Sequence, residues 1–240
     1  MATIQASSIL GKAEIILQDT SNIRWDETEL LGWLNDGQRE VVLHKPSANP
    51  VNETLQLSSA GTRQSIPDNG LALIDVVCNH TINGTSVKRS IRVIDRRILD
   101  AQRPDWHGET ATPSNPIIHF CFDDRDPRTF YLYPGAPLNT KVQIVYAASP
   151  VDISSASSVI TIDDVYANAL LDYVLYRAYS KDADYAANEQ RVMAAYQTFV
   201  NSLGIFEQSS MQSNPNYRTL SNVSPTYVGP SMPRTSGEGR

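Results

Sequence analysis

Residues 162–204 contain two runs of apolar residues at helical spacing, separated by a short polar turn. The apolar positions of the first run are Val165, Ala167, Leu170, Leu171, Val174, Leu175 and Ala178. Those of the second run are Ala186, Val192, Ala195, Tyr196, Phe199 and Leu203. Recurrence every three or four residues places such side chains in one stripe of a helix. Because only residues 180–184 separate the runs, the pattern predicts two helices folded back on each other as a hairpin.

The ends of this hairpin carry residues that favour helix termini. Thr161 is a candidate N-cap, and Asp164, three residues later, suits the positive end of the helix dipole. Gly204 follows the last apolar position, where a residue in the left-handed conformation commonly ends a helix. We therefore expect the helical segment to begin next to Thr161 and to end at Gly204.

The first 46 residues predict a second helical hairpin. Its first helix covers residues 7–20; the second begins at Asp26, with Glu29 as its capping-box partner, and ends at Pro46. The inner stripe of the second helix consists of Leu30, Leu31, Leu34, Gln38, Val41 and Val42. A lone hairpin buries only one side of each helix, so we expect the two hairpins to pack together as one helical bundle.

Between the hairpins, the sequence favours β structure with one short helix at 95–102. The extended segments are 53–57, 63–66, 71–79, 87–93, 117–122, 129–133 and 142–147. In the segment 87–93, Val87, Ile91 and Val93 are expected to share one face. Asn83-Gly84 is the strongest hairpin signal in the chain. These segments predict a compact sheet or a small sandwich.

The composition changes after residue 206. Of the 34 residues from 207 to 240, 20 are Ser, Thr, Asn, Pro or Gly, which is too polar a composition for a core of its own. The segment nevertheless retains two tyrosines, Tyr217 and Tyr227, and several apolar residues. We interpret it as a tail that becomes ordered against a partner; the alternative is a disordered end without a partner.

Together these patterns predict an α+β protein. Its helical bundle is built from an N-terminal hairpin (1–46) and a C-terminal hairpin (162–206). An antiparallel β domain (47–161) is inserted between the hairpins, and an extended C-terminal tail (207–240) follows them.

The charge and the apolar content of the chain exclude some classes of protein. The formal net charge is −6, and acidic residues outnumber basic ones by seven to four in residues 1–46 and by six to three in residues 162–204. Such a charge argues against a protein whose main task is to bind nucleic acid. No run of about 18 apolar residues is present, so no membrane span is expected, and the N-terminus lacks the features of a signal peptide.

Cys78 and Cys121 lie in apolar runs, which predicts buried free thiols in a reducing cytoplasm.

Asp123, Asp124 and Asp126 form the densest carboxylate cluster in the sequence. A divalent cation such as Ca²⁺ needs oxygen ligands that converge from several segments, whereas these residues share one turn with Arg125. We therefore interpret the cluster as a structural turn, with a metal-dependent enzyme as the alternative. The four histidines are isolated from one another in the sequence, and no catalytic, cofactor or metal site is predicted.

The one positive patch in the sequence is the cluster Lys88, Arg89, Arg92, Arg96 and Arg97. Solvated surface with local ion pairs is its simplest interpretation. Contact with another protein is the main alternative.

Three stretches of the sequence, in their order and spacing, resemble a known group of proteins. They are WDETELLGWLNDGQ at 25–38, DPRTFYLYP at 126–134 and the helix pair at 173–199. Over most of residues 5–204 the chain resembles the head-to-tail adaptor (connector) proteins of short-tailed bacteriophages, a family that includes tail tubular protein A. The resemblance implies a helical domain that docks under the portal protein, a β domain that faces the tail, and a C-terminal tail that wraps the portal.

The resemblance also implies a structural, non-enzymatic role at the head–tail junction of the virion, with assembly in the host cytoplasm. It implies a homo-oligomeric ring of about twelve copies between the portal and a tail nozzle or tail tube protein. Duplex DNA would pass through the ring during packaging and ejection without sequence-specific binding, and no membrane is involved. The candidate portal-binding residues are Tyr217, Arg218, Leu220, Tyr227 and Val228. The candidates for contact with a neighbouring subunit or the tail are Lys88, Arg89, Arg92, Arg96, Arg97 and Arg125.

A monomeric helical-hairpin interaction module of the tetratricopeptide kind is the alternative function. Ala178-Tyr179 and Ala194-Ala195-Tyr196 suggest it. Such modules consist of repeated hairpins, and this sequence has one such pair.

Overall fold

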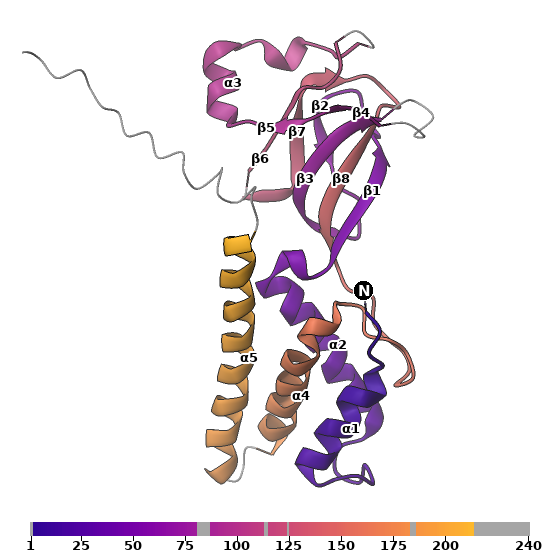
Figure 1. Ribbon diagram of the computed structural model, residues 1–240, viewed down its shortest axis with the longest axis vertical. Coiled ribbons are helices and arrows are strands. Elements are labelled where there is room, and N and C mark those ends of the chain that lie inside the picture. Colours follow the sequence, from indigo (N-terminus) through magenta and orange to yellow (C-terminus); the bar gives the residue numbers. More distant parts are fainter. Residues whose placement is uncertain (1, 81–86, 113–114, 124, 183–185, 214–240) are drawn as a thin grey trace, which may run out of the picture. The chain divides into compact units, whose positions relative to one another are not determined.

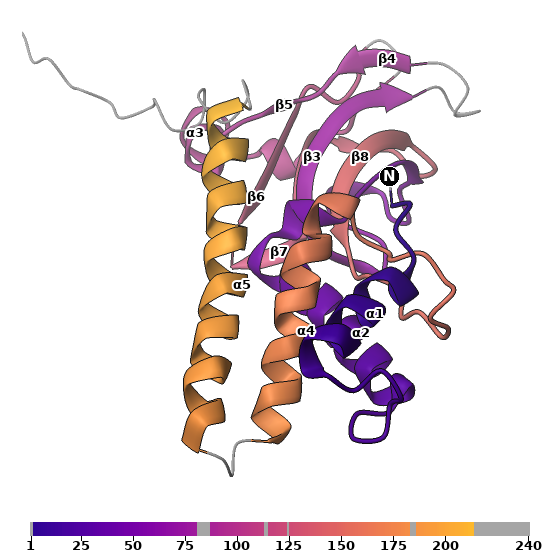
Figure 2. The same ribbon diagram turned by 60° about the horizontal axis from the view of Figure 1, so that its bottom comes forward.

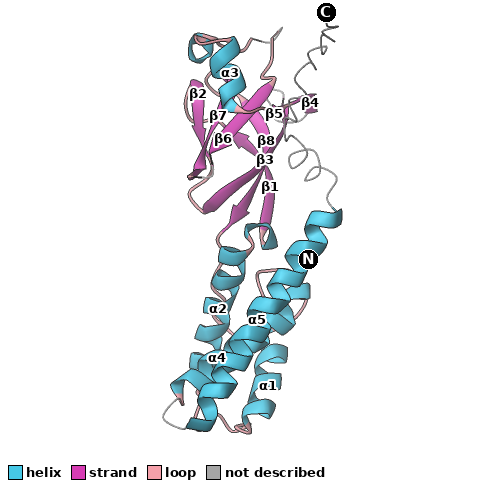
Figure 3. Ribbon diagram, turned by 90° about the vertical axis from the view of Figure 1, so that its left-hand side faces the viewer, coloured by secondary structure: helices cyan, strands magenta, loops and turns pink. Residues whose placement is uncertain are grey.

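The computed structural model describes residues 2–80, 87–112, 115–123, 125–182 and 186–213 (Figure 1). The described chain is a mixed α+β protein with five α-helices and two mostly antiparallel sheets, so the predicted α+β class is confirmed. Helices α1 and α2 precede the strands in the chain, and α4 and α5 follow them, as the colouring along the sequence in Figure 1 makes clear. Figure 3 shows the same helices in cyan and the strands in magenta.

The helices on either side of the strands cover the segments that the apolar spacing predicted. They are α1 (Ala6–Leu17), α2 (Glu27–His44), α4 (Ala167–Lys181) and α5 (Ala186–Ser213). Helix α4 packs against both α1 and α2, and in Figures 1 and 2 it lies between α1 and α5. The buried face of α4 includes Leu170 and Val174, neither of which is exposed to solvent.

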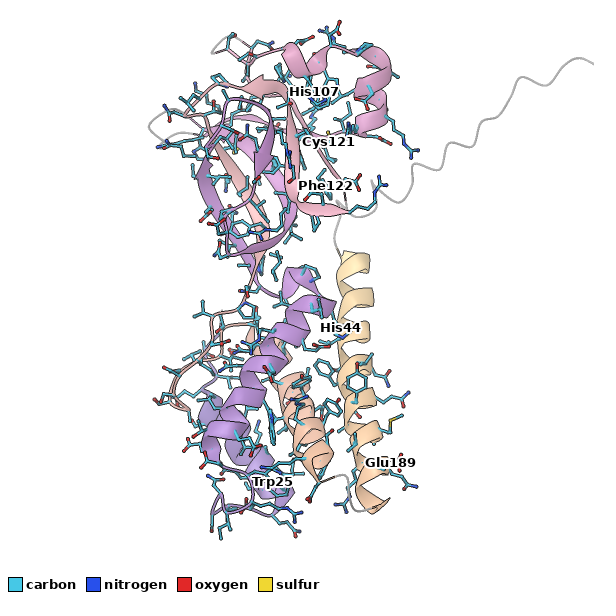
Figure 4. The ribbon with its side chains drawn as sticks, turned by 180° about the vertical axis from the view of Figure 1, so that it is seen from behind. Trp25, His44, His107, Cys121, Phe122 and Glu189 are labelled. Carbon is cyan, nitrogen blue, oxygen red and sulfur yellow. The ribbon has the colours of Figure 1, made fainter. Side chains whose placement is uncertain are left out.

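Aromatic side chains connect α5 with α4 and α2. Phe199 of α5 is fully buried, and its ring lies edge-on to that of Tyr173 on α4, with the ring centres 5.3 Å apart. The imidazole of His44 at the end of α2 (Figure 4) also contacts Phe199, with the ring centres 6.3 Å apart. These rings fill the space between the helices. Aromatic side chains bury a large apolar area each, so the contacts contribute strongly to the packing of α5.

The predicted N-cap of α2 is confirmed, and that of the second hairpin is wrong. The carboxylate of Asp26 accepts the amide N–H of Thr28 at 2.7 Å. Thr161 does not cap α4, which begins only at Ala167, after the 3₁₀ turn η3 (Asp164–Tyr166). Thr161 lies outside the helix because its amide N–H and its hydroxyl bond to two other segments, at Gln38 and Val151.

Asp164 connects the start of the second helical segment with the N-terminus of the chain. Its carboxylate accepts the amide N–H of Thr3 at 2.8 Å, the Thr3 hydroxyl at 2.6 Å and the amide N–H of Ile4 at 3.0 Å. These hydrogen bonds, those from Thr3 foremost, hold the pKa of Asp164 below its ordinary value. The carboxylate predicted to serve a helix dipole thus binds a distant segment instead.

Gly204 does not end a helix. It lies within α5, which continues to Ser213, beyond the predicted start of the tail at residue 207. A glycine inside a helix costs only about 1 kcal/mol relative to alanine. The next proline along the chain is Pro215, so no residue between Gly204 and Ser213 forbids helical backbone.

The strands form two four-stranded sheets, with the orders β1-β8-β3-β4 and β2-β7-β6-β5. Their bounds are β1 Pro50–Gln56, β2 Gly61–Ser65, β3 Gly70–His80, β4 Val87–Ser90, β5 Arg92–Val93, β6 His119–Asp123, β7 Asp126–Ala136 and β8 Lys141–Ala148. The two sheets share one apolar core, in which Val76, Phe130 and Ile144 are fully buried. The sandwich is therefore the correct form of the predicted β structure.

The predicted strand 87–93 is divided between the two sheets. Val87–Ser90 pairs with β3, whereas Arg92–Val93 pairs in parallel with β6. Between them Ile91 enters the shared core, and its amide N–H donates to the carbonyl of Val77 at 3.0 Å. A strand pattern cannot reveal this change of sheet, because both halves remain extended. The Asn83-Gly84 turn lies outside the described residues.

Two buried amide side chains of α2 bind the segment that leads from the strands to α4. The Oε1 of Gln38, a residue 1% exposed, accepts the amide N–H of Thr161 at 2.6 Å. Asn35 donates to the carbonyl of Ile153 at 2.9 Å and accepts its amide N–H at 3.0 Å. Gln38 also donates to Asn35 at 3.3 Å, so the two amides act as one unit.

Replacing Gln38 with Ala removes the acceptor for the amide of Thr161 and leaves a gap in the helical core. We expect the Gln38→Ala variant to lose about 1–3 kcal/mol of unfolding free energy, measured by urea denaturation. The exposed Gln197 on α5 is the matched control, and its replacement by Ala should change stability by less than about 0.5 kcal/mol. Equal effects of the two substitutions would contradict the role given to Gln38.

Candidate partner-binding site

A hollow of about 410 Å³ opens beside α3 (Arg96–Gln102) at the edge of the second sheet. It is surrounded by residues of α3, β6 and β7, of the segment just before α3, and of the turn between β6 and β7. They are Ile94, Asp95, Arg96, Arg97, Asp100, Cys121, Phe122, Asp123, Arg125 and Tyr131. Figure 4 labels Cys121 and Phe122 on β6, which contributes one wall.

Helix α3 forms where the sequence predicts it, and a small apolar core holds it on the sheet. The carboxylate of Asp95 caps the helix by accepting the amide N–H of Arg97 at 2.9 Å. Leu99 of α3, Trp106 and Cys121 of β6 are each at most 5% exposed and pack together. This apolar core forms the base of the hollow, and Cys121 belongs both to the core and to the lining.

Trp106 is the centre of this base. Its indole N–H donates to Asp100 at 2.9 Å, and its ring stacks on the imidazole of His107 with the ring centres 3.8 Å apart. The ring of Tyr131 lies edge-on to Trp106 at 6.3 Å. On the far side, the Nδ1 of His107 lies 2.8 Å from the hydroxyl oxygen of Thr62 on β2. The aromatic side chains thus connect α3 with strands β7 and β2 of the sandwich.

The arginines at the hollow differ in how their charge is compensated. Arg125 forms a two-point ion pair with Asp123, with Nε–Oδ1 at 3.0 Å and Nη2–Oδ2 at 2.8 Å, and this pair lowers the pKa of Asp123 to about 2. Arg96 lies over the Tyr131 ring at 5.3 Å, with its Nε 3.5 Å from Asp100. Arg97 makes no ion pair with any residue that the structure describes.

The structure brings together three of the six basic residues singled out in the sequence, namely Arg96, Arg97 and Arg125. The other three, Lys88, Arg89 and Arg92, are exposed but do not line the hollow. The candidate portal-binding residues Tyr217, Arg218, Leu220, Tyr227 and Val228 lie outside the described residues.

In the acidic turn, Asp123 and Asp126 face each other across the β6–β7 ladder, and Asp124 lies outside the described residues. Asp123 forms an ion pair with Arg125 within this turn. Within the described part of the chain, no group of three or more His, Cys, Asp or Glu side chains is placed to hold a metal ion.

Sequence reasoning missed the uncharged walls of the hollow, Cys121, Phe122 and Tyr131, and its base at Trp106. The only local signal was an apolar residue, Trp106, in a segment between Pro104 and Gly108 that is otherwise polar. Such a residue must find an apolar contact elsewhere, but the sequence does not say where.

Both cysteines are buried free thiols, as predicted. Burial raises the pKa of the Cys121 thiol to about 11, although the nearby Arg96 favours the thiolate. With a pKa of about 11 the thiol is protonated at neutral pH. Because the thiolate is the reactive form, we expect Cys121 to react slowly.

The model of the SU10 adaptor protein family matches residues 4–219 of the chain. The chain belongs to this family and is a phage adaptor protein, which is a structural and non-enzymatic kind of protein. Membership implies a location in the virion at the head–tail junction. No curated protein matches the chain, and none of its described helices is long and apolar enough to cross a membrane.

Because Cys121 is buried with a raised pKa, we expect the native protein to react with Ellman's reagent slowly at pH 7.5 and rapidly after unfolding. A matched control is Phe122→Cys, which places a thiol at a neighbouring position that is 37% exposed. That variant should gain one rapidly reacting thiol. Rapid reaction of native wild-type protein, removed by Cys121→Ser, would contradict the buried state of Cys121.

Proposed function

We propose that this adaptor forms a ring of about twelve copies that joins the portal to the tail and continues the DNA channel. The observation that carries the proposal is the family match, which spans all of the described helices and strands. A ring needs head-to-tail contacts, in which two different surfaces of one subunit meet their counterparts on its neighbours.

Exposed apolar side chains on the helices support assembly. Ile15 and Ile16 of α1 are 69% and 48% exposed, and Met193 of α5 is 65% exposed. Contiguous apolar surface often marks contacts with other proteins, and in our proposal these side chains contribute to such contacts. In our proposal the two hairpins, 1–46 and 162–206, form a single helical bundle that carries these residues and docks under the portal.

The charge distribution supports a passage for DNA. Acidic residues outnumber basic ones in both helical segments, and a negative wall repels duplex phosphates. DNA can then slide through the channel during packaging and ejection without sequence-specific binding. We propose that the bundle supplies this wall and that the ring assembles in the host cytoplasm.

The β domain at 47–161 carries the basic residues and, in our proposal, faces a tail nozzle or tail tube protein. The tail at 207–240 binds the portal through Tyr217, Arg218, Leu220, Tyr227 and Val228. The retention of apolar residues within that polar segment supports a role in binding.

The test is the native mass of the protein, alone and mixed with the portal protein of its phage. A complex that holds about twelve copies on the portal is expected, as ring closure requires. A protein that stays monomeric and does not bind the portal would refute the adaptor ring.

Deletion of residues 214–240 should leave the described helices and strands folded but weaken portal binding. The reason is that the tail contributes contacts with the portal and no core. The matched control is deletion of residues 229–240, which retains all five candidate tail residues and should preserve binding. Unchanged portal affinity after the longer deletion would show that the tail is dispensable. Binding is measured by co-sedimentation, with circular dichroism to verify folding.

A further inference from the structure

The hollow beside α3 has hydrogen-bond donors in excess of free acceptors. All three of its carboxylates already accept bonds within the domain: Asp95 caps α3, Asp100 binds Trp106 and Asp123 binds Arg125. A guanidinium carries five N–H donors. None of those of Arg97 is paired with a described residue, and Arg125 uses only its Nε and one Nη on Asp123. A ligand that brings acceptors can therefore use these unpaired donors.

Arg96 is held in place before any ligand arrives. Its guanidinium lies 5.3 Å from the centre of the Tyr131 ring, and its Nε is 3.5 Å from Asp100. These contacts leave both Nη groups of Arg96 without a partner among the described residues. A guanidinium that is already fixed loses less entropy when it binds a carboxylate, which favours two-point recognition.

An exposed aromatic ring adjoins these donors. Phe122 is 37% exposed, and its ring lies nearly parallel to that of the buried Phe120, with the ring centres 6.2 Å apart. The partner surface therefore offers an apolar contact as well as acceptors.

We infer that this hollow binds an acidic peptide segment of a partner protein. A Glu or Asp carboxylate is held by Arg97 and Arg96, and an adjacent apolar side chain packs on Phe122. The inference rests on the proposed adaptor function, because it gives the chemistry by which the β domain holds the tail protein.

Duplex DNA fits the hollow less well. It carries one negative charge per about 1.7 Å of helix axis, so a DNA backbone presents many charges at once. The lining holds three aspartates, Asp95, Asp100 and Asp123, beside its three arginines. The aspartates would repel such a polyanion, whereas a single carboxylate can reach the unpaired donors.

The test uses the purified full-length chain and two capped peptides, Ac-Gly-Leu-Glu-Leu-Gly-NH₂ and the same peptide with Gln in place of Glu. Binding is followed by ligand-observed NMR, which works whether or not the chain has assembled. We expect the Glu peptide to bind with a dissociation constant on the order of 1 mM and the Gln peptide to bind at least about tenfold more weakly.

Arg97→Gln should weaken binding of the Glu peptide about tenfold. The matched control is Arg92→Gln, which alters an exposed arginine on β5 that does not line the hollow and should leave binding unchanged. Both residues are exposed, so both variants are expected to fold.

Three outcomes would overturn the inference. They are equal binding of the Glu and Gln peptides, equal loss in the two arginine variants, and displacement of the Glu peptide by a 20-base-pair duplex whose own binding requires Arg97. The peptide measurement does not depend on the portal. A chain that binds the Glu peptide but ignores the portal would refute the adaptor ring and leave the peptide site, and the reverse result would refute the site alone.

Discussion

The buried amides of Asn35 and Gln38 hold the two helical ends of this chain together. They bind the backbone of the segment that returns from β8 to α4, at Ile153 and Thr161. A polar group buried without a partner costs free energy, so these two amides specify one position for the returning segment. Helix α4, which follows this segment, packs against α1 and α2 through its own buried apolar face, and Asp164 adds a second attachment, to Thr3 and Ile4.

In the sandwich, the side chains beneath the hollow are buried and packed together, whereas the arginines around its opening have donors left unpaired by the described residues. Leu99, Trp106 and Cys121 seat α3 on the second sheet, and the carboxylates around them bind groups of the domain itself. Arginines at the rim are left with unpaired donors, although the lining holds three arginines and three aspartates and so has no net charge. For recognition, the number of unpaired donors therefore matters more than the net charge.

The helical spacing located α1, α2, α4 and α5, and the extended segments located the strands to within a few residues. The helical spacing also placed Gln38 on the inner stripe of α2, where it is buried. The spacing did not indicate which segment Gln38 binds. The sequence prediction was wrong at residues whose type suits a helix end but also suits another role. Thr161 and Asp164 are good helix-capping residues, yet both bind other segments, and Gly204 lies inside a helix although it suits a helix end. Of the candidate site, sequence predicted the arginines but not the aromatic base, because Trp106 and Tyr131 are distant in the chain.

The sequence by itself determined which segments are helical or extended, that both cysteines are buried, and that the helical segments are acidic. These properties depend on apolar periodicity and composition, which are local. Only the tertiary structure decided that the strand at 87–93 divides between two sheets at Ile91. It also decided that Arg96, Arg97 and Arg125 meet at one hollow while Lys88, Arg89 and Arg92 do not. The physical reason is that both features depend on packing between segments far apart in the chain, where a buried side chain or a paired charge selects one arrangement among many that the same local pattern allows.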